Sequence, residues 1–171
     1  MPRYEPAGDA FQQASNSANV IHTPEQLGEP FPQYLPQPNP DLVQVQLPDP
    51  TLFSPPQNDF QQLALNRRSH RRYDTEAILS LAELGYLLRM TQGLRGFSQT
   101  HKLTRRYVPS AGSRHPFETY LAIQRVEGLE PGIYHYLPAQ HALEIWKSGI
   151  ESLRAAHSTT YDQKQASNSA V

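Results

Sequence analysis

The sequence predicts a mixed fold in which α-helices accompany an antiparallel β-sheet. One segment in the middle of the chain has helical periodicity and begins with a capping sequence. Three strand-like runs separated by short turns follow it towards the C-terminus. The N-terminal third differs from the rest, because 12 of the 16 prolines lie in the first 60 residues.

Composition limits the classes of protein to consider. With 171 residues, of which 37% are hydrophobic, the chain has room for about one domain with a modest core. The formal net charge of -1 argues against a nucleic-acid or membrane role that rests on overall charge. The absence of cysteine excludes disulfides, thiolate metal sites and cysteine nucleophiles. There is no apolar run of membrane-spanning length and no signal-peptide pattern, so we expect a soluble, cytoplasmic protein.

Residues 1–57 are predicted to form a proline-rich, extended arm. Proline removes a backbone donor and restricts the residue before it, so long helices and central strands are not expected there. Scattered apolar residues make the segment less polar than a pure linker. It either lies over a body, its own or a partner's, or is disordered, and the sequence leaves both alternatives open. Within the arm, Asp41–Leu47 alternates weakly, as a short edge strand does.

The body of the domain is predicted at residues 58–157, and its first element is a short helix. Asn58 or Asp59 is placed to cap this helix, which runs through Phe60–Leu65. Arginines follow its end, where the helix dipole favours cations. The dipole explains the first of these cations but not the whole basic run.

The best-marked element is a second helix, which begins with a capping box. Ser80 can accept a hydrogen bond from the Glu83 amide while the glutamate reaches back to the Ser80 amide. Apolar residues then recur at helical spacing, and Gly93 is placed to end the helix. Gly85 inside the helix costs about 1 kcal/mol relative to alanine, which predicts close packing against a neighbour. Residues 94–104 are predicted to be a loop.

Three strands are predicted after this loop and the turn that follows it. Phe117–Val126 is apolar on both faces through much of its length, so we expect a central strand. Ile133–Leu137 and Ala142–Lys147 follow, and two successive hairpins make an antiparallel meander. Gly149–Ala156 has the pattern of a further helix, and residues 158–171 are predicted to be a polar tail.

Two segments place cations beside small hydroxyl residues in irregular backbone, and they form the candidate binding site. We name Asn66–Asp74 the first basic segment and Arg105–Glu118 the second basic segment. Guanidinium groups, serine hydroxyls and free backbone N–H groups are what an anionic, phosphate-bearing ligand needs. We predict that the two segments converge on one ligand. The candidate binding residues are Arg67, Arg68, Ser69, Arg71, Pro109, Ser110, Ala111, Gly112, Ser113 and Arg114.

Simpler interpretations of the same residues stay open. The first basic segment can be a solvated loop, with Ser69 as a turn residue, and the second can be a tight loop before a strand. A nucleic-acid patch is less favoured, because no aromatic residues interleave the arginines and the rest of the chain is not basic. Glu118 either begins a strand and pairs with an arginine, or has no role.

The histidines and tyrosines of the predicted hairpins give no separate site. No metal site is predicted from the seven histidines. His135 and His141 flank a turn and are expected at the surface. Tyr134 and Tyr136 share one face of a strand and are expected in the core or in an interface.

Four motifs stand in a fixed order: RRSHR at 67–71, LAELGYLLRMTQG at 81–93, PSAGSRHPFE at 109–118 and VEGLEPGIYHYLPAQHALE at 126–144. Together they resemble the nitroreductase superfamily of FMN-dependent oxidoreductases, and within it the SagB-type azoline (thiazole/oxazole) dehydrogenases. The third motif is similar to that branch's PSAG-x-x-x-P-x-E turn. The resemblance covers about Phe60–Lys147.

This resemblance implies an α+β fold, with an antiparallel sheet flanked by helices. It also implies an intertwined homodimer with FMN at the subunit interface, in which hydride passes from a reduced donor through the flavin to an acceptor. The first basic segment would contact the FMN phosphate and ribityl chain, and the second would line the flavin. No nucleic acid and no membrane is implied as a partner.

The sequence departs from the family's pattern after Lys147. The family's domain continues there with further helices, a core strand and a second set of cationic contacts to the FMN phosphate. The catalytic lysine and tyrosine of the azoline branch belong to that later part, so no catalytic residue is assigned. We therefore expect the N-terminal half of a nitroreductase-like domain. The alternative to an active enzyme is a non-catalytic fragment, or a half that pairs with a complementary C-terminal half.

Overall fold

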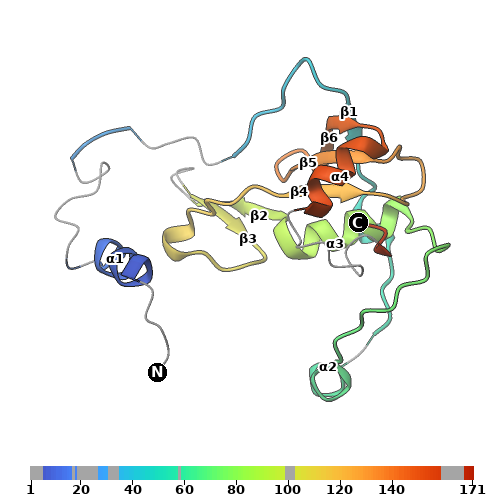
Figure 1. The fold of residues 1–171 in the computed structure, drawn as a ribbon, viewed down its shortest axis with the longest axis horizontal. Coiled ribbons are helices and arrows are strands. Elements are labelled where there is room, and N and C mark those ends of the chain that lie inside the picture. The colour runs from blue at the N-terminus through green and yellow to red at the C-terminus, as the bar shows by residue number, and fades with distance from the viewer. Residues whose placement is uncertain are drawn as a thin grey trace. The chain divides into compact units, whose positions relative to one another are not determined.

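A computed structural model describes residues 6–16, 18, 27–30, 35–57, 59–98, 103–158 and 168–171. The chain divides into two compact units, Met1–Gln33 and Tyr34–Val171. The first unit contains helix α1, Pro6–Ser15 (Figure 1). A helix of this length differs from the extended arm that the prolines predict. It forms because Pro6 occupies the first helical position, where its missing N–H costs nothing, and the rest of the helix contains no proline.

The second unit is built on a four-stranded antiparallel sheet in the order β1-β6-β5-β4. Its strands are β1 (Gln44–Gln46), β4 (Tyr120–Ile123), β5 (Gly132–Leu137) and β6 (Ala142–Ser148). Strands β4, β5 and β6 form the predicted meander, and β1 is the predicted edge strand of the arm. Helices beside an antiparallel sheet confirm the predicted α+β fold class.

Strand β4 lies at an edge of the described sheet, so the prediction of a central strand is wrong. The strand is also shorter than predicted, because the residues after it bond elsewhere. Val126 forms a parallel bridge with Leu79. The N–H groups of Gln124 and Arg125 donate to the Ala170 carbonyl at 2.9 and 3.1 Å. These contacts also give the described end of the predicted polar tail, residues 168–171, a place beside β4; residues 159–167 lie outside the described part of the chain.

Helix packing accounts for the apolar pattern that suggested a central position for β4. Helix α3, Leu81–Gln92, contributes Leu84 and Leu88 to the same core cluster as two residues of β4. Helix α4, Ile150–Ser158, contacts β4 and β5 and buries Leu153. Helices can therefore cover apolar side chains of a strand that has no strand neighbour on one side.

Helix α3 begins with the capping box that the sequence predicts. The Glu83 N–H donates to Ser80 Oγ at 3.2 Å, and the Ser80 N–H donates to Glu83 Oε2 at 3.0 Å. The Ser80 hydroxyl also donates to Glu83 Oε2 at 2.6 Å, and this bond, followed by the one from the Ser80 N–H, lowers the pKa of Glu83. Gly85 is buried, and a β-carbon there would lie 3.6 Å from both His141 Nε2 and Leu47 Cβ. The predicted close packing at Gly85 is therefore confirmed.

The segment after α3 forms a hairpin, so the prediction of a loop at 94–104 is wrong. Strands β2 (Leu94–Phe97) and β3 (Thr104–Arg106) pair as a separate two-stranded antiparallel sheet. Side chains along β2 alternate between half-buried and exposed positions. The strand has only four residues, which is too short a run for the sequence to show this alternation clearly. A register shift at Gly96 weakens the pattern further.

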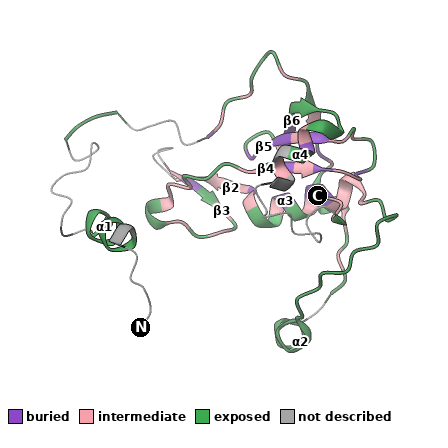
Figure 2. Ribbon diagram, in the orientation of Figure 1, coloured by how far each residue is buried: buried purple, intermediate pink, exposed green. Residues whose placement is uncertain are grey.

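Helix α2, Phe60–Asn66, is capped by Asp59, whose side chain accepts the Gln62 N–H at 2.8 Å. The other predicted capping residue, Asn58, lies outside the described residues. Every residue of α2 is exposed, so this helix packs no face against the described sheet (Figure 2).

Burial is concentrated in the sheet, in β4, β5 and the first half of β6, while α3 adds Leu84, Gly85 and Leu88 (Figure 2). Tyr134 and Tyr136 are each 1% exposed, which confirms the prediction that they belong to the core. Residues 35–57 of the predicted arm belong to the same compact unit as the sheet, while the boundaries at 57 and 157 stay predictions. No helix among the described residues is long and apolar enough to span a lipid bilayer. The core cluster consists of Leu47, Leu84, Leu88, Leu121, Ile123, Val126, Tyr134, Tyr136 and Leu143.

Candidate functional site

The second basic segment forms a wall of a groove of about 540 Å³, a volume typical of small-molecule sites. The segment connects β3 to β4 and turns through a short 3-10 helix, Ala111–Ser113. Four of the six candidate residues in this segment line the groove, and Gly112 and Ser113 are the two that do not. The lining residues are Gln92, Val108, Pro109, Ser110, Ala111, Arg114, His115, Pro116 and Phe117.

The turn has an unusual backbone, which internal hydrogen bonds hold. Gly112, Ser113 and His115 have positive φ angles of 62°, 54° and 45°. Glycine adopts this region freely, and histidine enters it more often than most other residues. The Ser113 N–H donates to the Ser110 carbonyl at 3.0 Å, and the His115 N–H donates to Ser110 Oγ at 2.9 Å. Ser110, which the sequence suggests as a ligand contact, is thus an internal acceptor that fixes the turn.

His115 lines the groove. Burial, followed by the Arg106 cation, lowers the pKa of His115, while a hydrogen bond to the Thr104 backbone acts in the opposite direction. Burial also lowers the pKa of Arg106, and nearby Tyr136 and Glu118 oppose that shift. The buried Nε of Arg106 has no hydrogen-bond partner. The groove therefore presents a neutral imidazole at pH 7.

The first basic segment is exposed throughout, and none of its residues lines the groove. The Arg68 guanidinium donates to the carbonyls of Leu65 and Arg67, at 3.2 and 3.0 Å, and so caps the end of α2. Within one chain the structure thus gathers part of the candidate site at the groove and leaves the rest away from it. The residues that do not reach the groove are Arg67, Arg68, Ser69 and Arg71.

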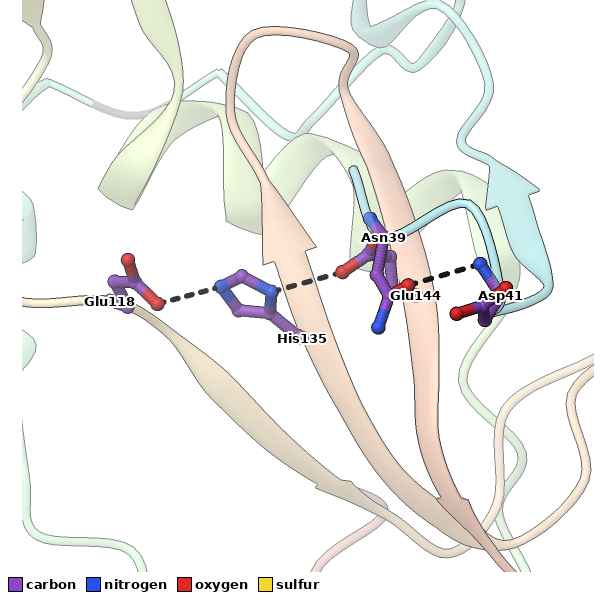
Figure 3. Close-up of polar contacts among 5 residues, drawn as sticks. All are labelled: Asn39, Asp41, Glu118, His135 and Glu144. Atoms are coloured by element: carbon purple, nitrogen blue, oxygen red, sulfur yellow. Dashed lines mark hydrogen bonds and ion pairs between the residues drawn. The ribbon is translucent and has the colours of Figure 1, made fainter. Parts of the chain in front are cut away.

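A cluster of two carboxylates and one imidazole extends across the sheet from the end of the second basic segment, with Glu144 and His135 buried and Glu118 exposed (Figure 3). Glu144 and His135 are 2% and 4% exposed, and Glu144 Oε2 lies 3.3 Å from His135 Nδ1. Glu118 Oε2 lies 3.2 Å from His135 Nε2, without the alignment of a hydrogen bond. The second Glu144 oxygen accepts the backbone N–H of Asn39. The cluster therefore connects the second basic segment to the arm through the sheet.

Sequence reasoning missed this cluster. The expectation that His135 and His141 lie at the surface is wrong, since His135 is buried and the half-buried His141 ring contacts Tyr136 Oη at 2.9 Å. Glu118 pairs with a histidine, and not with the arginine that was one of its two predicted roles. A usable signal is the register of the predicted hairpin, which sets His135 opposite Glu144 as a cross-strand pair.

A smaller pocket of about 330 Å³ lies between α3 and residues 49–51 of the arm. Tyr107 forms part of its wall. The guanidinium carbons of Arg89 and Arg95 lie 5.6 and 5.3 Å from the centre of the Tyr107 ring. Both distances are within the range of cation–π contacts. Among the described residues, no group of three or more histidines and carboxylates is arranged to hold a metal ion.

Fold and groove together define an α+β domain with a groove of mixed polar and apolar lining beside its sheet. The profile of the nitroreductase family matches residues 64–171, which is more than half of the chain. The chain therefore belongs to the nitroreductase family, a family of oxidoreductases. The family resemblance that the four motifs suggested is confirmed at this level, and the azoline branch stays a prediction.

Two relatives match parts of the chain. The protein named "Putative nitroreductase MJ1384" of Methanocaldococcus jannaschii is 33% identical over 106 residues, which are 60% of this chain and 46% of that protein. The trifolitoxin-processing protein TfxB of Rhizobium leguminosarum bv. trifolii is 40% identical over 58 residues, which are 32% of this chain and 16% of that protein. The chain thus spans less than half the length of each of these relatives.

Proposed function

We propose that this protein is an FMN-dependent oxidoreductase of nitroreductase type, which transfers hydride through a flavin at a homodimer interface. The observation that carries the proposal is the groove of about 540 Å³ beside the PSAG turn, in a chain of the nitroreductase family. FMN, when bound, supplies the hydride chemistry, and the protein supplies position and electrostatics.

The residues of the groove fit the ring system of a flavin. Pro109 and Ala111 are compact enough to lie against a flat ring, while Ser110, Arg114 and His115 offer polar atoms at its edge. Half-buried Arg106 lies near His115 without lining the groove, and its positive charge would favour an electron-rich edge of the ring.

The phosphate and ribityl contacts are assigned to Arg67, Arg68, Ser69 and Arg71 of a second copy of the chain. In one chain these residues are exposed, and no carboxylate of a described residue forms an ion pair with their guanidiniums. The adjacent helix α2 leaves Phe60 86% exposed and Leu65 67% exposed, which suits burial against a partner. A homodimer would therefore bring the two basic segments together across its interface.

A flavin titration of the purified chain, with its mass in solution measured by light scattering, tests the cofactor and the assembly together. The expected result is a protein that retains flavin absorbance after gel filtration and has the mass of a dimer. A protein that stays colourless after incubation with excess FMN would contradict the proposed function. A monomer with bound FMN would contradict the dimer interface and the assignment of the phosphate contacts to a second copy.

Within the family, the azoline dehydrogenase branch is the proposed subgroup. Its support is the PSAG-x-x-x-P-x-E pattern at 109–118 and the 40% identity over 58 residues to a protein named for trifolitoxin processing. The substrate would then be a thiazoline or oxazoline in a peptide. Incubation of FMN-loaded protein with a thiazoline peptide should produce the thiazole with a mass loss of two hydrogens. An unchanged peptide, alongside reduction of a nitroaromatic by the same sample, would place the protein outside this branch. A cytoplasmic location stays a prediction.

A second candidate function is a non-catalytic or partner-dependent half of a nitroreductase-like protein. It is favoured by the share of the relatives that the chain spans, 46% and 16%, and by exposed apolar side chains such as Phe60 and Phe117. Co-purification of the chain with a polypeptide that corresponds to the remaining part of a relative tests it. Flavin binding only in the mixture would favour the second candidate, and flavin binding by the chain alone would favour the first.

A further inference from the structure

The smaller pocket between α3 and the arm is a hollow to which the proposed function assigns no ligand. We name it the Tyr107 pocket, after the ring that forms part of its wall, and its volume is about 330 Å³. None of the residues that line it also lines the larger groove. Its volume is at the lower end of the range for small-molecule sites, so it suits a small ligand such as a single ring with a polar group.

We propose that the Tyr107 pocket binds a small organic carboxylate, and that Arg89 holds the carboxylate group. The ligand class is an acid with an apolar or aromatic body, either free or as the C-terminal residue of a peptide. This inference goes beyond the proposed function, because it requires neither a flavin nor the groove assigned to the flavin.

Two guanidinium groups meet at one ring of the pocket wall. The guanidinium carbons of Arg89 and Arg95 lie 5.6 and 5.3 Å from the centre of the Tyr107 ring. The ion pairs found among the described residues include neither arginine. Two cations that share a ring without a paired carboxylate repel each other, and an anion bound beside them would offset that repulsion.

The charge of the pocket wall favours a singly charged anion. Asp49 is the carboxylate among the residues that line the pocket, and its Oδ1 already accepts the backbone N–H and the hydroxyl of Thr51, at 2.9 and 2.8 Å. One carboxylate beside two guanidiniums leaves a formal charge of +1. This charge matches a carboxylate and would leave a phosphate dianion partly uncompensated. The planar fork of a guanidinium also fits the two oxygens of a carboxylate.

Arg89 is fixed at the end of α3. Tyr86, Arg89 and Met90 stand at positions i, i+3 and i+4 of the helix, so one helix face presents all three to the pocket. A β-carbon at Gly93 would lie 2.6 Å from Arg89 Cδ, so the glycine leaves the space that the arginine stem occupies. A binding group on a helix is placed more precisely than one on a loop.

Much of the remaining wall is apolar. It consists of Pro50, Met90 and the rings of Tyr86 and Tyr107. The Tyr86 ring packs against the Phe53 ring, with the ring centres 5.1 Å apart, and this contact supports it from the arm side. An apolar wall with one charged group is typical of sites that orient a small ligand by its polar end.

Titration with benzoate and with benzamide tests the inference, because the two probes have nearly the same shape and differ in charge. Backbone amide shifts of ¹⁵N-labelled full-length protein give the dissociation constants. The unsubstituted protein is compared with Arg89→Gln and with Arg105→Gln. Arg105 is the matched control, since it is an exposed arginine of β3 that lines neither the pocket nor the groove.

The unsubstituted protein and Arg105→Gln should bind benzoate about tenfold more tightly than benzamide, the effect of a charge-assisted hydrogen bond. In Arg89→Gln the two probes should bind within about twofold of each other, since the cation is gone. Equal binding of the two probes by the unsubstituted protein would overturn the carboxylate assignment. Undiminished discrimination in Arg89→Gln would overturn the role of Arg89.

The position of the shifted amides tests the site without any substitution. On addition of benzoate, the shifts should be largest at residues 49–51, 86–90 and 107, which contain the pocket wall. Shifts confined to other segments of the chain would overturn the location of the site.

A benzoate titration in saturating FMN separates the pocket from the groove. The affinity for benzoate should change by less than about twofold, because two independent sites have no coupling free energy. Competition between benzoate and FMN would overturn the inference and leave the flavin function intact. Benzoate binding as expected in a protein that binds no FMN would support the inference and overturn the proposed function.

N-acetylphenylalanine, which resembles the end of a peptide, distinguishes the two sources of the carboxylate. Tighter binding of this probe than of benzoate would support the peptide form of the proposal, and tighter binding of benzoate would support the free acid. In both cases Arg89→Gln should weaken the binding about tenfold. If the unsubstituted protein binds neither probe, the inference is wrong.

Discussion

The two basic segments have similar compositions and entirely different structures. The first basic segment, residues 66–74, is exposed along its whole length. The second, residues 105–118, has three residues with positive φ, an internal serine acceptor and a half-buried arginine, and it borders a groove. The comparison teaches that cations and hydroxyls become a binding surface only where neighbouring strands and helices fix their geometry. Four predictions test this contrast, from the largest expected effect to the smallest.

Removal of the Glu144 carboxylate should cause the largest loss of stability. Glu144→Ala leaves buried His135 and the Asn39 N–H without their shared acceptor, and loss of one partner of a buried pair costs about 3–5 kcal/mol. Urea unfolding followed by circular dichroism measures the change. The control is Glu76→Ala, next to the first basic segment, where the side chain is exposed and the change should stay within about 0.5 kcal/mol. Equal effects at the two positions would remove the distinction between a fixed and a solvated region.

Ser110→Ala and Ser69→Ala compare the same substitution in the two basic segments. Ser110 Oγ is the acceptor of the His115 N–H, so its loss should destabilise the protein by about 2 kcal/mol. Ser69 is exposed, and its replacement should change stability by less than about 0.5 kcal/mol. Thermal unfolding of the two variants, measured side by side, compares their losses of stability. A larger loss for Ser69 would show that the first basic segment is the more structured one.

Arg68→Gln tests whether the first basic segment gains a role from a bound ligand. If its guanidinium contacts the FMN phosphate across a dimer, affinity for FMN should fall about tenfold, while affinity for riboflavin, which lacks the phosphate, should not change. Arg154→Gln is the control, since the Arg154 side chain is 78% exposed on α4. Parallel losses for FMN and riboflavin would indicate that Arg68 acts on the fold and not on the phosphate.

The smallest expected effect is a dependence of stability on pH near the groove. The pKa of His115 is lowered in the folded protein by burial and by the Arg106 cation. The unfolded chain therefore binds more protons than the folded chain below about pH 6.5, and stability should fall as the pH falls through the folded pKa. His115→Gly should reduce this slope, by at most about 1.4 kcal/mol per pH unit. Burial and the Arg89 cation also lower the pKa of His141. His141 therefore adds a dependence of stability on pH with the same sign, and His115→Gly should retain that part. An unchanged slope in His115→Gly would contradict the assigned shift.

Local signals in the sequence predict the fold well where a few adjacent residues determine the structure. The Ser80–Glu83 box fixes the start of α3, and short turns fix the pairing of β5 with β6. The position of β4 at an edge is not a local property, because it depends on where the Ala170 carbonyl and Leu79 lie.

The candidate site shows the same limit. The residue types of the second basic segment predict a polar wall, and four of its six candidate residues line the groove. The positive φ of His115 depends on hydrogen bonds inside the turn, which the residue types alone do not predict. The buried pair of His135 and Glu144 follows from strand register, which requires the exact length of the intervening turn.

The bond between Glu144 and the Asn39 N–H has a practical consequence for anyone who shortens the chain. Proline-rich leaders are commonly trimmed before crystallisation, and a cut at the predicted boundary after residue 57 would look harmless. It would remove β1, the amide at Asn39 and buried Leu47 in a single step. A cut before Leu35 would keep β1, its pairing with β6 and the Asn39 N–H.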